Sequence, residues 1–310
     1  MNRSLHAPML MLASTVGFGL MAITIRLASK TEPTLEVAFF RSFFGGLIAL
    51  PIIFWPLLRQ RRPLKDYAAE VKTNQLRRYV VRCLIGVVSM FCGFWAISNL
   101  PLSQAIALAY SSPIFATIAA ALLLGEKVRA RRWAAVVIGF LGMLVIVRPW
   151  SHAFSMGALV AISAALITAI VAIQIKQLTR EDTPNTIVFW TYVFWIPMSL
   201  LPAMFVWHWP QGDAWIWLIA SGILGTVGQL LWTRALNIGD VSALTPISFV
   251  QLPIVTFAGW AMFGESIDAW TLGGAAIILS ATAYISHREA KLARQNKSMQ
   301  PSSGSEPGGN

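Results

Sequence analysis

Long apolar segments alternate with short polar ones along most of the chain. The apolar segments cover residues 8–29, 35–57, 79–99, 102–124, 132–149, 155–176, 185–207, 214–236, 241–263 and 268–286. A helix needs about 20 consecutive apolar residues to cross the hydrocarbon core of a bilayer. The segments are too long for barrel strands, and they lack the period-two alternation of such strands. The pattern therefore predicts an all-α integral membrane protein with ten transmembrane helices.

Two polar stretches lie outside these segments. Residues 58–78 form a basic loop whose pattern favours a short interfacial helix. Residues 287–310 end in QPSSGSEPGGN, a composition too polar and too rich in Gly, Ser and Pro to fold alone. We predict a disordered cytoplasmic tail over 287–310.

The composition of the chain agrees with a lipid environment, and the distribution of its basic residues predicts how the chain is oriented in the membrane. The chain is 56% hydrophobic and 12% charged, with a formal net charge of +11, which on a soluble protein would favour nucleic-acid binding. The basic residues instead gather in loops on one side, whereas the other side receives only Arg26, Lys30 and Arg148. Positive residues are retained in the cytoplasm during insertion. We expect both termini inside and anionic lipid, rather than nucleic acid, as the partner of the basic face.

A Gly-Glu corner, the point where one apolar segment ends and the chain turns toward the next, occurs twice in the sequence with different charge. LLLGEKVRARRW (122–133) and AMFGESIDAW (261–270) both place Gly-Glu after an apolar segment, but only the first continues with basic residues. The corner belongs to a longer repeat, residues 94–143 and 233–282, related by a shift of about 139 positions. Five helices per copy is an odd number, so the second copy enters the membrane inverted. Inverted repeats are typical of secondary transporters.

The repeat defines the predicted organisation of the chain. We expect a first five-helix repeat over 1–149, a second inverted repeat over 150–286, and the tail over 287–310.

The chain resembles the EamA-type drug/metabolite transporter superfamily. The resemblance rests on PLSQAIALAYSSPIFATIAAALLLGEKV (101–128), GFLGMLVIV (139–147), the counterpart DVSALTPISFVQLPIVTFAGWAMFGES (240–266) and EVAFFRSFFGGL (36–47). It implies a ten-helix permease in which helices 1, 3, 4, 6, 8 and 9 line a central cavity. It also implies that a small solute moves through this cavity by alternating access.

Polar and aromatic residues on these cavity helices are the candidate solute contacts. They are Tyr110, Ser111, Gln229, Gln251, Trp95 and Trp232. The polar groups serve either as interhelical hydrogen bonds or as solute ligands, and the tryptophans either pack in the membrane or stack on a planar solute. Their position on the cavity helices that the family implies favours solute contact.

A second group of residues is predicted to act in gating or in structure. Arg41 lies inside the second segment, where a buried cation is costly unless it is paired, and Glu36 is the candidate partner. Arg41 is either a structural anchor whose side chain reaches the membrane interface, or a contact for the solute or the gate. Pro113 and Pro253 lie inside segments, so each would kink its helix and free a carbonyl. Glu126 and Glu265 either stabilise the positive end of the next helix or act as gates.

Missing motifs exclude other functions. The sequence has no G-x-x-x-x-G-K-[ST] loop for ATP hydrolysis and no HExxH or other metal cluster, and no acidic residue or His lies mid-segment. We predict no enzyme activity, no cofactor or metal, and no obligate protein partner. The predicted function is a secondary, non-ATP-driven transporter of a small organic metabolite or drug-like solute in the inner membrane, either an exporter or an exchanger. The alternatives are an importer, for example of a vitamin or nucleoside-like metabolite, and a non-transporting scaffold.

Overall fold

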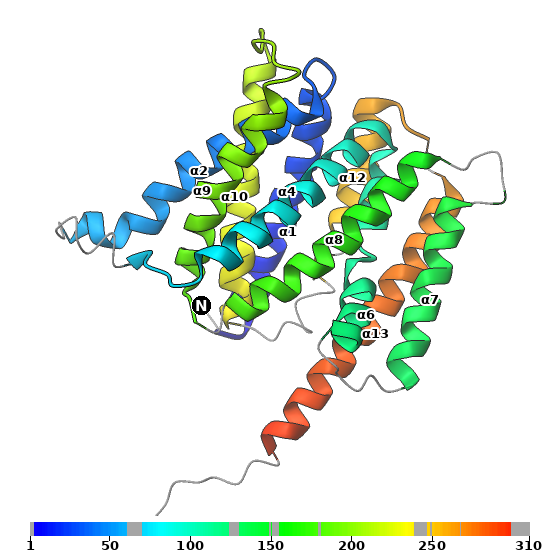
Figure 1. Cartoon of the computed structure of the whole chain (residues 1–310). Helices are drawn as coiled ribbons and strands as arrows, with labels where there is room; N and C mark the ends of the chain where they lie inside the picture. Colours follow the sequence, from blue (N-terminus) through cyan, green and yellow to red (C-terminus); the bar gives the residue numbers. More distant parts are fainter. Residues whose placement is uncertain are drawn as a thin grey trace, which may run out of the picture.

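The described part of the protein is entirely helical (Figure 1). The computed structural model describes residues 3–60, 70–123, 130–148, 150, 155–178, 181–238, 247–248, 250–266 and 268–298. Its helices are α1 (Arg3–Ala28), α2 (Thr34–Arg59), α4 (Leu76–Asn99), α5 (Leu102–Ala109), α6 (Ser112–Leu123), α7 (Ala130–Val147), α8 (Met156–Leu178), α9 (Pro184–Ala203), α10 (Ala214–Ile238), α12 (Gln251–Phe263) and α13 (Ala269–Ser298).

Several of these helices are suited to a membrane. Among the described residues, six apolar stretches are long enough to cross a bilayer: His6–Ala28, Thr34–Trp55, Leu76–Asn99, Met156–Ile175, Asn185–Ala203 and Ala214–Trp232. Shorter apolar helices cover Val136–Val147, Gln251–Phe263 and Ala269–Ala281. The all-α membrane class is confirmed, while the count of ten spans and the orientation stay predictions.

The fourth apolar segment is not one helix, which corrects the prediction for 102–124. Helix α5 ends at Ala109 and α6 begins at Ser112, with a tight turn at Tyr110 and Ser111. Pro113 is the second residue of α6. A proline further inside a helix would lose a hydrogen bond and clash with the carbonyl four residues earlier, whereas in the first turn it costs neither. The chain therefore breaks ahead of the proline.

Pro253 follows the same rule. It is the third residue of α12, where backbone N–H groups have no intrahelical partner. The expectation that Pro113 and Pro253 each free a carbonyl inside a continuous helix is wrong. Both prolines instead lie at the starts of helices.

The last helix is longer than predicted. Helix α13 runs for 30 residues to Ser298, through part of the tail that we expected to be disordered from residue 287. Residues 288–297, REAKLARQNK, consist mostly of strong helix formers, so the helix that starts with the apolar stretch Ala269–Ala281 continues through them. Residues 299–310 lie outside the described part.

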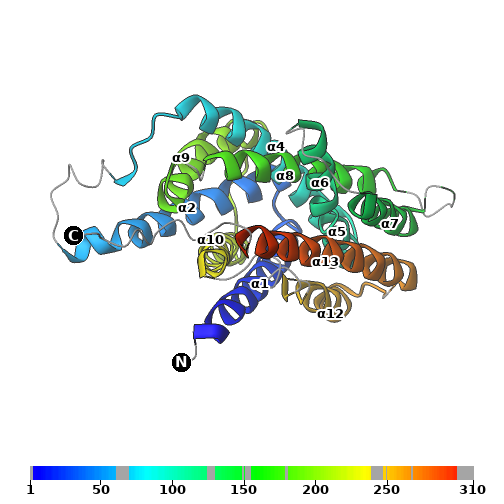
Figure 2. The same cartoon turned by 90° about the horizontal axis from the view of Figure 1, so that it is seen from below.

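Glycines let the helices approach closely where they pack. Helix α1 packs along α10, and a Cβ added at Gly17 would lie 3.5 Å from the Cα of Gly228. Helices α7 and α13 also run side by side, and a Cβ at Gly274 would lie 2.6 Å from the carbonyl oxygen of Gly142. Such small-residue contacts are the usual basis of helix association in lipid. Figure 2 shows these two pairs from below, beside α4 and α8.

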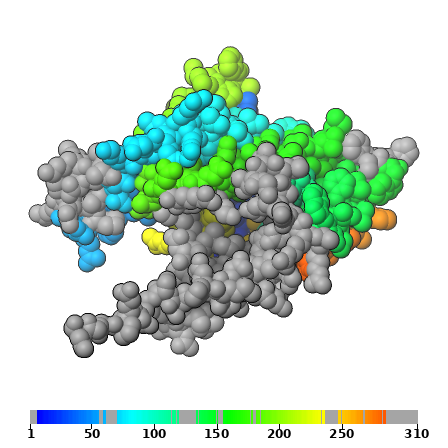
Figure 3. Space-filling model, turned by 60° about the horizontal axis from the view of Figure 1, so that its bottom comes forward, coloured from blue at the N-terminus to red at the C-terminus, as the bar shows by residue number. Residues whose placement is uncertain are grey.

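The bundle has two ends that are named here for later use. The Glu265 end contains residues 29–33, 204–213 and 264–266, at the top of Figure 1. The Arg78 end is opposite and contains the start of α4 and the end of α8. Seen with the lower end forward, α4 and α8 lie side by side at the surface (Figure 3).

Candidate functional site

The break after α5 meets the segment that leads into α12. The Tyr110 hydroxyl donates a hydrogen bond to the carbonyl of Ser248, and it lies 3.1 Å from the side-chain amide of Gln251. With the repeat shift of about 139 positions, Tyr110 corresponds to residue 249. The Tyr110 phenol thus connects the turn between α5 and α6 to Ser248 and to the first residue of α12. We call this contact the Tyr110–Gln251 junction.

Interrupted helices supply polar backbone groups in an apolar setting. At the start of α6, Pro113 has no N–H, and the N–H groups of Ile114 and Phe115 donate to the Ser111 carbonyl. Helix starts nevertheless attract negative charge through the helix dipole. Transporters often bind their solutes at such interruptions. Tyr110 and Gln251 are two of the predicted solute contacts, and the fold brings them together.

The other predicted contacts occupy different surroundings. Ser111 is fully buried, and its hydroxyl donates to the Leu108 carbonyl at 2.6 Å, so it stabilises the turn after α5. Gln229 is half-buried on α10, next to the glycine that faces α1. Trp95 and Trp232 are 39% and 36% exposed. Trp95 lies beside the start of α8, where a Cβ at Gly157 would be 3.1 Å from its ring.

Glu265 links three segments at the Glu265 end. Its carboxylate lies 3.2 Å from Nη2 of Arg26 on α1 and accepts a 2.8 Å hydrogen bond from the backbone N–H of Leu102, the first residue of α5. Arg26 also donates to the Ile97 carbonyl at 2.8 Å. We call this set of contacts the Glu265 link. Gly264, at the end of α12, adopts the left-handed conformation (φ 64°) that turns the chain toward it.

The partner of Glu265 differs from the expected one. We expected the carboxylate to lie at the start of the helix that follows it, α13, but it stabilises the start of α5, far away in sequence. Asp268 takes the expected role, because its carboxylate accepts from the N–H of Thr271 at 3.1 Å and pairs with Arg148 at 2.9 Å. The matching Glu126 lies outside the described residues.

Arg41 is buried and lacks the expected partner. It is 8% exposed, so it does not extend to the interface as an anchor would. No ion pair joins it to Glu36 in the part of the chain that the structure describes. Glu36 instead accepts from the backbone N–H of His208 at 2.6 Å. The guanidinium of Arg41 lies over the ring of Trp195, 5.7 Å from its centre.

A carboxylate–histidine cluster at the Glu265 end was not predicted. The Nε2 of His208 lies 2.8 Å from Glu32, and its Nδ1 lies 3.5 Å from Glu36. Possible ligand atoms of all three residues lie within 4.8 Å of one another, so together they could hold a divalent cation. No sequence pattern indicates this cluster, because His208 comes from a loop 172 residues after Glu36.

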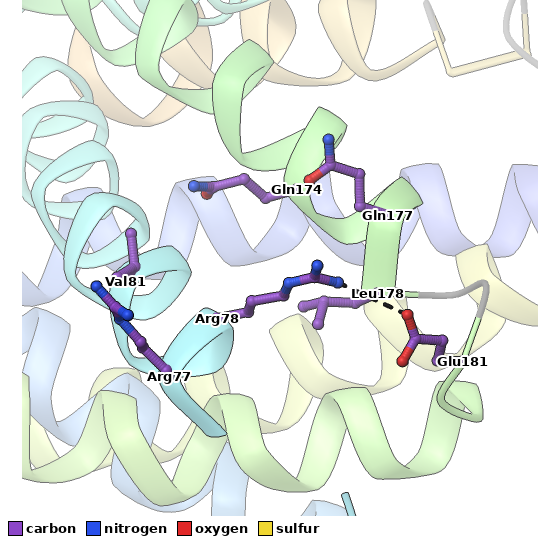
Figure 4. Close-up of a pocket in the computed structure, with 7 residues that line it drawn as sticks. All are labelled: Arg77, Arg78, Val81, Gln174, Gln177, Leu178 and Glu181. Carbon is purple, nitrogen blue, oxygen red and sulfur yellow. Dashed lines mark ion pairs between the residues drawn. The ribbon is translucent and has the colours of Figure 1, made fainter. Parts of the chain in front are cut away.

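A surface pocket lies at the Arg78 end, between α4 and α8 (Figure 4). It has a volume of about 610 Å³ and is lined by Arg77, Arg78, Val81, Gln174, Gln177, Leu178 and Glu181. Arg78 and Glu181 form a 3.7 Å ion pair across it, and both side chains are largely exposed. None of the predicted site residues lines this pocket.

Comparison with known proteins decides the class of this protein. Residues 6–148, and again residues 155–287, match the sequence profile of the EamA-like transporter family. The chain belongs to this family. As an EamA-family protein it is a multi-pass inner-membrane transporter and not an enzyme.

Related EamA-type proteins have several named solutes. The chain is 30% identical to a riboflavin transporter of Vibrio cholerae serotype O1, over 86% of this chain and 87% of the relative. It is 28% identical to an S-adenosylmethionine uptake transporter of Rickettsia felis (85% and 86% covered). It is 30% identical to the pseudopaline exporter CntI of Pseudomonas aeruginosa (87% and 92% covered). These names include both uptake and export.

A solved structure shares the fold. It superposes with a TM-score of 0.64 over 92% of this chain and 98% of that chain, at 18% sequence identity.

Proposed function

We propose that this EamA-family protein is a secondary transporter that moves a small organic solute across the inner membrane by alternating access, as an exporter or an exchanger. The observation that carries the proposal is the Tyr110–Gln251 junction, where the turn between α5 and α6 meets the start of α12, the corresponding part of the second repeat. Secondary transporters bind their solutes where membrane helices are interrupted. No energy from ATP is needed, because the solute or ion gradient drives the cycle.

We further propose that ten spans form two inverted five-helix repeats with both termini inside. The two stretches that match the family profile support this division. The direction of the helices supports it as well, because α12 ends at the Glu265 end, whereas α6 ends at the opposite end (Figure 1). The two Gly-Glu corners therefore follow helices of opposite direction.

In this orientation the Glu265 link closes the outer mouth. It fastens Arg26 on α1 and Leu102 on α5, both from the first repeat, to Glu265 from the second. The two repeats must separate there before a solute can leave to the outside. Glu126 is the proposed counterpart at the inner mouth.

Site-directed labelling tests the topology. We expect a membrane-impermeant maleimide to label Asp268→Cys in intact cells and to label Lys127→Cys only in opened cells, in a background with Cys83 and Cys92 replaced by alanine. The positive-inside rule assigns these corners to opposite compartments. Labelling of both positions from one side would contradict the inverted repeat.

Flux through proteoliposomes tests the transport function. Riboflavin and S-adenosylmethionine, the solutes named for relatives, would head a panel of radiolabelled metabolites. We expect saturable flux without ATP, and faster efflux when unlabelled solute is present on the far side if the protein is an exchanger. Uptake named for the Rickettsia relative favours an importer as the second candidate. Flux in oriented vesicles separates the two directions, and vesicles no more permeable than empty ones to the whole panel would favour a scaffold.

A further inference from the structure

Two buried arginines from different helices share one indole ring. Arg41 on α2 is 8% exposed and Arg82 on α4 is 6% exposed. Their guanidinium carbons lie 5.7 Å and 5.9 Å from the ring centre of Trp195 on α9. The three helices pack against one another in pairs. Two cations are therefore held close together inside the bundle.

Several hydrogen-bond donors of this group are unused. The Nε atoms of Arg41 and Arg82 and the indole Nε1 of Trp195 are buried, and none has a hydrogen-bond partner among the described residues. The neutral partners of Arg82 are the hydroxyl of Thr191 and the sulfur of Cys83, the latter at 3.7 Å. No carboxylate forms an ion pair with either arginine in the described ranges. Positive charge and N–H donors are both left without compensation.

Such an arrangement is costly unless something negative completes it. A buried cation in a membrane protein is normally paired or faces a functional site. Two positive charges near one ring repel each other, which raises the free energy of burying each of them. The face of Trp195 attracts a guanidinium, but it supplies no net negative charge and no hydrogen-bond acceptor. A purely structural role would require an acidic partner, and Glu36 is held instead by the loop that carries His208.

Two glycines lie directly against the unused donors, so no side chain covers the donors from these positions. A Cβ added at Gly225 on α10 would lie 3.0 Å from Nη2 and 3.1 Å from Nε of Arg41. A Cβ added at Gly86 on α4 would lie 3.4 Å from Nε1 of Trp195. Any larger residue at either position would press directly on these nitrogens. The chain thus keeps both positions free of side chains where an acceptor would have to approach.

We propose that Arg41, Arg82 and Trp195 form a binding site for an oxyanion, the carboxylate or phosphate group of an organic solute. A guanidinium offers a planar fork of donors that fits either group with two parallel hydrogen bonds. The indole N–H provides a further donor of fixed direction. The identification of this anion as the transported solute rests on the proposed function, whereas binding of the anion does not. The transported class would then be organic acids, including zwitterions that carry a carboxylate.

Thermal stability of the full-length protein in lipid nanodiscs tests the site. The probes are succinate for carboxylates and inorganic phosphate for phosphates, each titrated against chloride at equal ionic strength. We expect at least one probe to raise the Tm saturably, because a ligand that binds the folded state stabilises it. Arg41→Gln and Arg82→Gln should each weaken the apparent affinity at least tenfold. Arg59→Gln, at the exposed end of α2, is the matched control and should leave the affinity unchanged.

The same measurement without any probe separates a binding site from a structural anchor. If the arginines bind an anion, Arg41→Gln removes an uncompensated charge and keeps or raises the Tm of the empty protein. If Arg41 only stabilises the packing of the buried helices, the Tm falls. Should a glutamine variant fail to fold, Arg41→Lys retains the charge without the fork, and the affinity should still fall.

The results have distinct consequences for the two proposals. No saturable shift with either probe, or an equal shift in the arginine variants, overturns the anion site. Trp195→Phe keeps the ring but loses the donor, so its affinity should lie between those of the native protein and the arginine variants. Flux of a neutral solute together with no anion binding would reject the site and keep the transporter. Anion binding without any flux would keep the site and reject the transporter.

Discussion

Replacing Glu265 with alanine is expected to open the protein toward the Glu265 end. The substitution removes the ion pair with Arg26 and the acceptor of the Leu102 N–H, both partly buried. Hydrogen bonds to charged groups contribute about 1.5–3 kcal/mol each, so losing even one of the two contacts should shift the equilibrium between closed and open states roughly 10- to 150-fold. The measurement is the rate at which an impermeant maleimide labels Ser111→Cys, next to the junction, from outside.

Two further variants make this result specific. Glu265→Gln keeps an acceptor for Leu102 but loses the ion pair, so its labelling rate should be intermediate. Asp268→Asn removes the ion pair with Arg148 at the same end, but α7 and α13 stay packed along their glycines. Its labelling should match that of the unmodified protein. Equal rates in the Glu265→Ala and unmodified proteins would show that the link is not a gate.

Replacing Tyr110 with phenylalanine should reduce flux about tenfold without changing the amount of protein in the membrane. The hydroxyl is the only atom removed, and with it go the bond to the Ser248 carbonyl and the contact with Gln251. A buried acceptor that loses its donor costs about 1–3 kcal/mol. If the junction holds the solute or joins the two repeats during the cycle, the lost free energy slows transport. Initial flux at several solute concentrations measures it.

The matched control for this variant is Tyr192→Phe. The Tyr192 hydroxyl lies 2.8 Å from the hydroxyl of Thr226 and joins α9 to α10 away from the junction. Its loss should lower thermal stability and leave flux within about twofold. Gln229→Ala extends the test to α10, where we expect a smaller loss of flux. The junction would be only structural if Tyr110→Phe and Tyr192→Phe affected flux and stability alike.

Features that depend on neighbouring residues in sequence could be predicted. Apolar length was enough to indicate helices and a membrane, because the bilayer imposes it on every span. A glycine directly after an apolar segment favours a left-handed helix end, and Gly264 ends α12 in this way. The family resemblance put both Tyr110 and Gln251 on cavity helices, but it did not predict that the two side chains meet.

Features that depend on tertiary contacts could not be predicted. Nothing near Arg41 in the sequence indicates Trp195, which lies 154 positions later and receives a second arginine from α4. Glu36 was predicted to pair with Arg41 on spacing alone. Its carboxylate instead accepts a hydrogen bond from the backbone N–H of His208, in the loop between α9 and α10. The break at Tyr110 was missed because apolar composition does not distinguish one long helix from two short ones.

The length of α13 determines where its carboxyl-terminal end, at Ser298, lies. Thirty residues of helix extend about 45 Å, compared with about 30 Å of hydrocarbon, so the helix must continue beyond the lipid as a stiff rod. A fluorescent reporter fused to this terminus would be carried on that spacer and not pressed against the headgroups. Energy transfer from such a reporter to a membrane dye should therefore be weaker than from one attached at residue 287.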